Sequence, residues 1–259
     1  MKKKLLAMAV VLAVFCQAGE VLINPRSQTD FGAAAEIEVS PDGVMRPTGA
    51  NCVHTVQHSV VDPAKTYCVT VEYKRAPGAP QNARGVVVVV PFNKRARQIE
   101  GVHVSFVAGS EAAVVLEHSP LRGKRVVLEL NDAWARELEK GARRTYAAVY
   151  KAEKDLSDIP NFAWSVIRAQ RVEEGRLVLD VDWTPSLVKG DLVRLHYYGW
   201  LGIGRDVIPD DGWQTLSYEI TGVSKSACGD KFWAGTSAVG LGLYGKDVLY
   251  RNFTFEELE

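Results

Sequence analysis

The 259-residue sequence lacks the features that mark nucleic-acid-binding, membrane-spanning or repeat proteins. Its 31 basic residues are matched by 31 acidic ones, so no basic excess points to nucleic acid as a partner. Beyond the N-terminus, no apolar run approaches the ~20 residues that a membrane-spanning helix needs. No internal period of roughly 20–50 residues indicates a repeat array. The hydrophobic fraction of 47% excludes general disorder.

The N-terminus carries the pattern of a secretory signal peptide. Lysines at 2–4 precede an apolar run at 5–15, and small residues follow. This order predicts removal of residues 1–18, with cleavage after Ala18. Acylation of Cys16 is the lesser alternative, because that modification needs a small residue where the large Phe15 stands. We therefore expect an exported protein, secreted or at the periplasm or cell surface.

Cysteines are few, and an odd number would remain after cleavage: Cys52, Cys68 and Cys228. Export permits disulfides. A hairpin centred on the turn at 61–65 would set Cys68 near His58, about 20 Å of strand from Cys52. A disulfide tolerates only ~7 Å between Cα atoms, so Cys52 and Cys68 can pair only if their strands lie in different sheets. Three unpaired core cysteines are the alternative.

Strand patterns fill most of the chain. Residues 67–74 alternate, with Tyr67 and Val69 on the apolar side, whereas 84–92 is a continuous β-branched run typical of a strand buried on both faces. The sequence EEG at 173–175 predicts a tight hairpin.

A single helix is expected at 131–144, capped by Asn131 or Asp132, ended by Gly141 and packed down by Trp134. The pattern as a whole predicts an all-β, antiparallel β-sandwich or jelly roll with one short helix.

We expect this sandwich over residues 19–259, with 93–160 as an insertion or a second small β layer. The polar, irregular stretch PFNKRARQIEG at 91–101 marks a weak boundary near residue 92, and a second lies near 175.

Several motifs resemble β-sandwich carbohydrate-binding modules. They are LINP (22–25), HSVVDPAKTYCVTVEYKRAPG (58–78), DGWQTLSYEITGV (211–223) and KDVLYRNFTFEEL (246–258). The stretches KGDLVRLHYYG and FWAGTS are similar to large exported proteins of environmental and gut bacteria that carry galactose-binding-like jelly-roll domains. The resemblance covers residues 20–90 and 160–259 in patches.

This resemblance implies a non-catalytic protein that binds carbohydrate, with aromatic rings stacked on the apolar faces of sugars and polar groups at their hydroxyls. In the strand 189–200, an apolar set alternates with a polar set, and Trp200 follows. The candidate ligand-binding residues are Arg194, His196, Tyr198, Trp200, Trp213 and Trp233. For the polar set, the alternative is a solvated outer face of the sheet. Trp164 and Trp183 are assigned to the core or a sheet edge.

No catalytic constellation is evident. HTVQH (54–58) lacks the Glu of a metalloprotease helix and lies in a predicted strand, so we interpret it as structural. Carboxylates are plentiful, at Asp180, Asp182, Asp206, Asp210, Asp211 and Glu219. A carbohydrate-active hydrolase or lyase is therefore the alternative function, and it would need carboxylates ~5–9 Å apart or a His with Tyr or Arg converging in one groove. The third candidate function is that of a structural or adhesive surface protein.

No cofactor is expected. The segment 206–212 could hold a structural calcium ion, although a solvated turn is the favoured interpretation.

Overall fold

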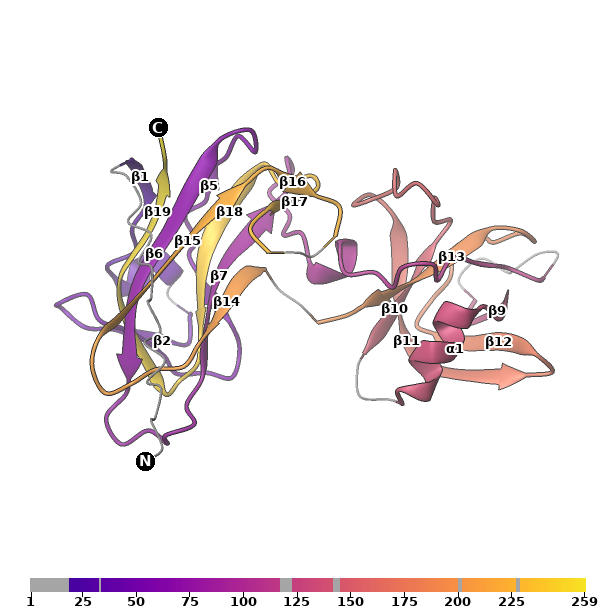
Figure 1. The fold of residues 1–259 in the computed structure, drawn as a ribbon, viewed down its shortest axis with the longest axis horizontal. Coiled ribbons are helices and arrows are strands. Elements are labelled where there is room, and N and C mark those ends of the chain that lie inside the picture. Colours follow the sequence, from indigo (N-terminus) through magenta and orange to yellow (C-terminus); the bar gives the residue numbers. More distant parts are fainter. Residues whose placement is uncertain (1–18, 33, 117–122, 142–144, 200–201, 227–228) are drawn as a thin grey trace, which may run out of the picture.

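The computed structural model describes residues 19–32, 34–116, 123–141, 145–199, 202–226 and 229–259. Within these ranges it shows three large antiparallel sheets, a small two-stranded one and a single α-helix (Figure 1). The predicted all-β sandwich is confirmed. The predicted signal peptide lies outside the described residues, as do Trp200 and Cys228.

Two of the sheets form the sandwich. The first runs β15-β6-β19-β3-β2, with β1 added along β19. Its strands are β1 Glu20–Ile23, β2 Ile37–Val39, β3 Met45–Pro47, β6 Thr66–Arg75, β15 Gln214–Thr221 and β19 Val248–Glu257. The second runs β14-β7-β18-β4, with β5 also on β18. Its strands are β4 Val53–His54, β5 Ser59–Val60, β7 Gly85–Phe92, β14 Ile203–Val207 and β18 Ala238–Tyr244.

The sandwich core lies between these sheets. Tyr67 and Val69 of β6 are buried there, as the alternation predicted, and they share one cluster with Val87 and Val89 of β7. The β-branched run of β7 is buried on its other face too, where Val88 joins a small separate cluster. One face of β7 thus packs into the sandwich core, and the other face packs into the small separate cluster.

The third sheet is an insertion between two neighbouring strands of the sandwich. β7 and β14 pair antiparallel, with Val89 opposite Ile203, so the chain leaves and re-enters at one place. The inserted sheet runs β8-β13-β10-β11-β12-β9. Its strands are β8 Ala112–Ala113, β9 Arg125–Glu129, β10 Tyr146–Tyr150, β11 Ala163–Glu173, β12 Arg176–Val181 and β13 Leu192–Tyr197. The insertion therefore extends well beyond the predicted 93–160.

The helix α1, Asp132–Glu139, packs on this inserted sheet (Figure 1). The Asn131 side chain caps it by accepting the backbone N–H of Trp134 at 3.0 Å. Trp134 is fully buried and donates its indole N–H to the carbonyl oxygen of Ser110. The predicted hairpin joins β11 and β12, and both its turn residues have positive φ, 49° at Glu174 and 75° at Gly175.

The strands on either side of the turn at 61–65 do not form a hairpin but lie in different sheets. β5 pairs with β18 in one sheet, whereas β6 lies between β15 and β19 in the other. The local turn signal could not show that the chain crosses between sheets there. Cys52 is free and Cys68 is disulfide-bonded, so they do not pair with each other. The partner of Cys68 lies outside the described residues.

The insertion packs against the sandwich around β17 (Phe232–Trp233), which pairs with β16 (Val223–Ser224). Ile99 and Ile159 belong to the same apolar cluster as Phe232 and Trp233. After β17 the chain turns at Gly235, where an added Cβ would lie 2.9 Å from Cγ of Pro160. Two short 3-10 helices, Gln28–Phe31 and Gly101–His103, complete the described elements.

Candidate functional site

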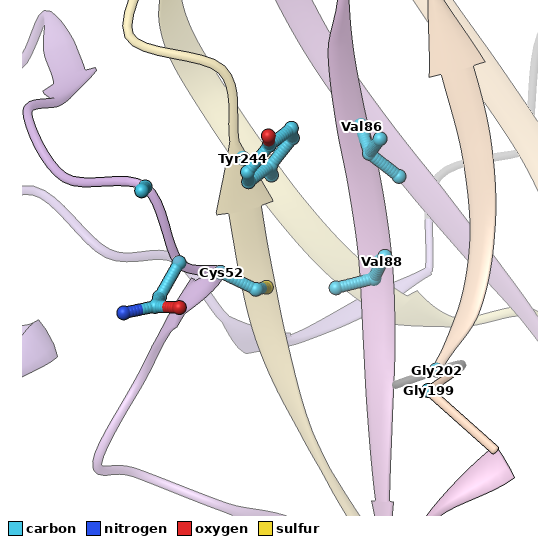
Figure 2. A pocket seen from close by; sticks show the side chains of 8 residues that line it. Cys52, Val86, Val88, Gly199, Gly202 and Tyr244 are labelled. Carbon is cyan, nitrogen blue, oxygen red and sulfur yellow. The ribbon is translucent and has the colours of Figure 1, made fainter. Parts of the chain in front are cut away.

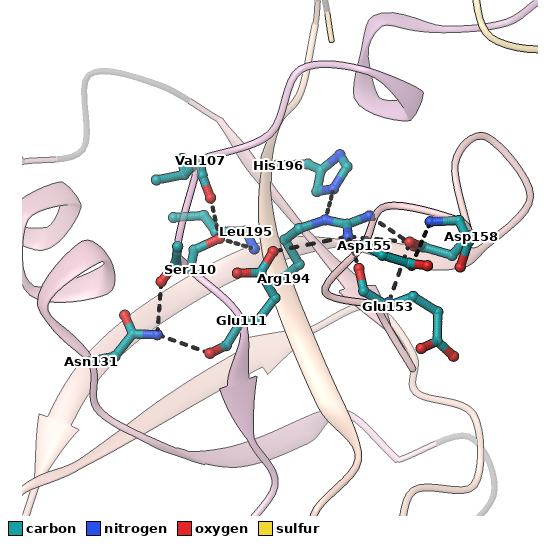
Figure 3. Close-up of polar contacts among 12 residues, drawn as sticks. Val107, Ser110, Glu111, Asn131, Glu153, Asp155, Asp158, Arg194, Leu195 and His196 are labelled. Carbon is teal, nitrogen blue, oxygen red and sulfur yellow. Dashed lines mark hydrogen bonds and ion pairs between the residues drawn. The ribbon is translucent and has the colours of Figure 1, made fainter. Parts of the chain in front are cut away.

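The predicted polar face of β13 is buried. Arg194 and His196 each have 0% exposure, because the segments around 101–107 and 153–162 cover them (Figure 3). The opposite face of β13 carries Val193 and Leu195 in the core of the inserted sheet. Both faces of this strand are therefore internal, and neither Arg194 nor His196 offers a surface to a glycan.

Arg194 is fully paired within the protein. Its guanidinium binds both carboxylate oxygens of Asp158, at 3.2 and 2.7 Å, and donates to the carbonyl oxygen of Glu153 at 3.1 Å (Figure 3). The rings of Phe106 and Phe162 lie 5.6 and 6.0 Å from its central carbon. These contacts hold the 153–162 loop against β13, so Arg194 has a structural role.

His196 completes the same network. The Arg194 Nε–H donates to Nε2 of His196 at 2.8 Å, so the ring proton must sit on Nδ1, which donates to the carbonyl oxygen of Val102. Burial is the largest influence on the imidazole and lowers its pKa from 6.5 to about 3, while the Val102 carbonyl opposes this. A neutral, doubly hydrogen-bonded histidine connects the 3-10 helix Gly101–His103 to the inserted sheet.

The two described tryptophans of the predicted set, Trp213 and Trp233, lie in different surroundings. Trp233 is 2% exposed and lies in the sandwich core. Trp213 is half-buried between two cations, with Arg251 4.0 Å and Lys74 4.7 Å from its ring. Trp200 lies outside the described residues. The structure therefore does not bring the described members of the predicted set into one surface.

Tyr198 is the predicted residue that remains accessible, at 41% exposure. Its ring lies 5.6 Å from that of Trp164, which in turn contacts His103 edge-on at 6.4 Å. His103 stacks on Phe162 at 5.5 Å. We call these four rings the aromatic wall. The sequence did not predict this cluster. Phe162 lies in a loop and Trp164 at the start of β11, and no sequence pattern links either of them to His103.

Two rings of the aromatic wall, those of His103 and Phe162, line a cleft of about 680 Å³ where the insertion meets the sandwich. One side is the segment after β7, the other is the start of β11 with Pro160, and Gly235 of the sandwich closes the end. The lining residues are Asn93, Lys94, Arg95, Arg97, Gln98, Ile99, His103, Pro160, Asn161, Phe162, Ala163 and Gly235. The size and the junction position are typical of a ligand site.

The cationic side of this cleft is a tight turn at residues 93–97. The Asn93 side-chain oxygen accepts the backbone N–H groups of Arg95 and Arg97 at 2.9 and 3.1 Å, and Ala96 takes a positive φ of 54°. Lys94, Arg95 and Arg97 are exposed on the turn. Within the described parts of the chain, none of the three forms an ion pair. We call residues 93–97 the basic turn; the irregular stretch at 91–101 was its signal in the sequence.

His103 is the titratable group inside the cleft. Burial lowers the pKa of its imidazole, while the backbone of Glu100 opposes this. Its Nδ1 lies 3.1 Å from both the nitrogen and the carbonyl oxygen of Glu100. The ring is therefore neutral at pH 7, and the charge of the cleft comes from the basic turn.

A smaller hollow of about 200 Å³ lies on the outer face of the β7 sheet (Figure 2). Val86 and Val88 face Tyr244 and Cys52 across it, and Gly202 of the strand entry lies at one end. Burial raises the pKa of the Cys52 thiol to about 11, so the thiol stays protonated and is a poor nucleophile. This hollow is apolar and small, and we do not assign it a function.

Both histidines of the motif at 54–58 pack against Phe92. His58 stacks on Phe92 with ring centroids 3.7 Å apart, and His54 meets the same ring edge-on. In the described parts of the chain, no three His, Cys, Asp or Glu side chains gather as a metal-binding group. Across the same ranges, no helix is long and apolar enough to cross a membrane. Asp211 of the predicted calcium segment forms an ion pair with Arg75 at 3.2 Å.

Comparison of the chain with protein-family models, curated proteins and solved structures found no match in any of the three. The resemblance to galactose-binding-like modules therefore stays a prediction from the quoted motifs.

Proposed function

We propose that this protein is an exported, non-catalytic carbohydrate-binding protein, and that its site is the cleft between the sandwich and the insertion. The observation that carries the proposal is the composition of that cleft, whose lining combines the Phe162 and His103 rings with amide and cationic side chains. Sugars present apolar C–H faces and hydroxyl groups together, and such a lining suits both.

Export is proposed from the N-terminal pattern. The first described strand, β1, begins at Glu20 and pairs with β19. Cleavage after Ala18 would leave that pairing intact in the mature chain.

The test is affinity electrophoresis of residues 19–259 through gels that contain different polysaccharides. Phe162→Leu removes the ring from the cleft while keeping an apolar side chain against Arg194. We expect it to weaken binding about five- to tenfold, because an aromatic contact contributes roughly 1 kcal/mol. Trp183→Leu is the matched control, since Trp183 is 40% exposed and contacts Tyr150 rather than the cleft. Migration unaffected by every polysaccharide would refute the proposal.

One observation favours the alternative of a hydrolase or lyase: a neutral histidine, His103, lies in the same groove as two arginines. Its Nε2 can act as a base only in the tautomer whose Nδ1–H donates to Glu100. Incubation of the protein with each retained polysaccharide, followed by measurement of new reducing ends, decides between binding and cleavage. His103→Gln would abolish such cleavage.

A further inference from the structure

The cleft carries a local charge that the chain as a whole does not have. Lys94, Arg95 and Arg97 line it, and no Asp or Glu is among its described lining residues. Nearby, Asp158 is already neutralised by Arg194. The sequence has equal numbers of basic and acidic residues, so this excess of three positive charges belongs to the cleft.

The three cations are available and held in place. Their turn is fixed by Asn93, whose backbone N–H also donates to the carbonyl oxygen of Arg97 at 2.9 Å. The segment then continues with Ile99, whose N–H donates to Pro91 at 2.8 Å. A rigid turn presents the cations without the ordering cost of a mobile loop. Since no described side chain pairs with them, a ligand anion would displace only water and counterions.

From this charge we infer that the ligand of the cleft is an anionic polysaccharide, whose carboxylate or sulfate groups bind Arg95, Arg97 and Lys94 while its sugar faces contact the rings of His103 and Phe162. The inference rests on the proposed function and narrows its ligand class. Guanidinium groups bind carboxylates and sulfates through paired, charge-assisted hydrogen bonds, which are stronger than hydrogen bonds to neutral hydroxyls.

The experiment compares two polymers that differ only in charge: polygalacturonate and the same polymer with its carboxyl groups reduced to alcohols. Residues 19–259 are run through gels containing each, at low salt and at 0.5 M NaCl (about a tenfold rise in ionic strength from a dilute buffer). We expect strong retention by polygalacturonate that falls with salt, and weak retention by the reduced polymer. Dextran sulfate in a third gel shows whether sulfate can replace carboxylate.

The variant is Arg95→Gln with Arg97→Gln, and the control is Lys124→Gln with Arg136→Gln, two exposed cations on the insertion away from the cleft. The first pair should weaken binding to polygalacturonate at least about tenfold and leave the reduced polymer unaffected. The control pair should bind as the unmodified protein does.

Four results would overturn the inference. Equal retention by charged and reduced polymers, unchanged in Arg95→Gln/Arg97→Gln, would leave the proposed function standing with a neutral glycan as ligand. The same conclusion would follow if neither polymer retained the protein but another, neutral polysaccharide did. No retention by any polysaccharide would refute both the inference and the proposed function. Binding of single-stranded DNA as tight as that of polygalacturonate would show a general polyanion surface without sugar recognition.

Discussion

At the scale of single residues, the alternating strand at 189–200 shows what a period of two can and cannot reveal. The pattern separates Arg194 and His196 from Val193 and Leu195, and the structure keeps them on opposite faces. It does not reveal that the polar face is covered as well. That cover comes from Val102 and Asp158, which lie 94 and 36 residues away in the chain. A buried cation needs such partners to offset its lost hydration.

Because His196 is neutral in the folded protein, we expect the free energy of unfolding to depend on pH. Its folded pKa of about 3 lies below the ordinary value of 6.5, so the unfolded chain binds a proton that the folded protein excludes. The contribution of neutral His196 to the free energy of unfolding is fully present above pH 6.5 and is lost progressively as the pH falls towards 3. Urea unfolding between pH 7.5 and 4.5 should show a loss of up to a few kcal/mol.

The His196→Gln variant separates this histidine from other groups. Glutamine can still accept from Arg194 and donate to Val102, but it has no proton to gain. The variant should lose less stability over the same pH interval, although His103 and His58, whose pKa values are also lowered, keep part of the slope. Identical slopes in the variant and the unmodified protein would contradict the assignment.

At the scale of elements, local signals succeeded where the cause was local. The helix cap at Asn131 and the turn at Glu174 and Gly175 are fixed by their own residues, and both are found as predicted. The partners of β5 and β6 depend on which sheet the chain enters after the turn, which no neighbouring residue specifies. The cleft is likewise built from the basic turn, the start of β11 and Gly235, so no single segment carried its pattern.

Gly235 tests how closely the sandwich and the insertion must approach. It has a positive φ of 83°, and an added Cβ would meet Pro160 at 2.9 Å. Gly43 has nearly the same φ, 79°, but nothing within 4 Å. Gly43→Ala should therefore cost only the backbone strain, about 1 kcal/mol, whereas Gly235→Ala should cost roughly 1–3 kcal/mol more.

Thermal and urea unfolding of both variants measures the difference. Gly235→Ala should also perturb ligand retention, because this glycine closes one end of the cleft, while Gly43→Ala should not. Equal losses of stability in the two variants would mean that Pro160 can move away from the added Cβ without a loss of folding free energy.

At the scale of the whole molecule, the described residues form two main apolar cores, and one of them includes residues from both units. Among the described residues, the core of the inserted sheet is made from residues of the insertion, including Trp134 and Leu179. The sandwich core is made mostly from the two flanking sheets, but Ile99 and Ile159 of the insertion also belong to it. The insertion is thus a unit with its own core that contributes to the sandwich at one contact.

Because β7 and β14 are neighbours, the insertion can be replaced by a turn without changing the strand register. Val89 pairs with Ile203, which places Val90 opposite Gly202. Joining these two by Asn-Gly, the sequence preferred in two-residue hairpins, keeps that alignment. We expect the shortened chain to fold with the far-ultraviolet circular dichroism of a β-sandwich and to lose all retention by polysaccharide, since both sides of the cleft are removed.

Its stability should be lower by several kcal/mol, because Phe232 and Trp233 lose their cover from Ile99 and Ile159, each worth about 1.5–3 kcal/mol when buried. Replacing Trp233 by Gln in the shortened chain should not recover stability, because it removes an indole that packs in the sandwich core. An unfolded shortened chain would show that the sandwich needs the insertion to form. Retention of polysaccharide by a folded one would move the binding site from the junction to the sandwich itself.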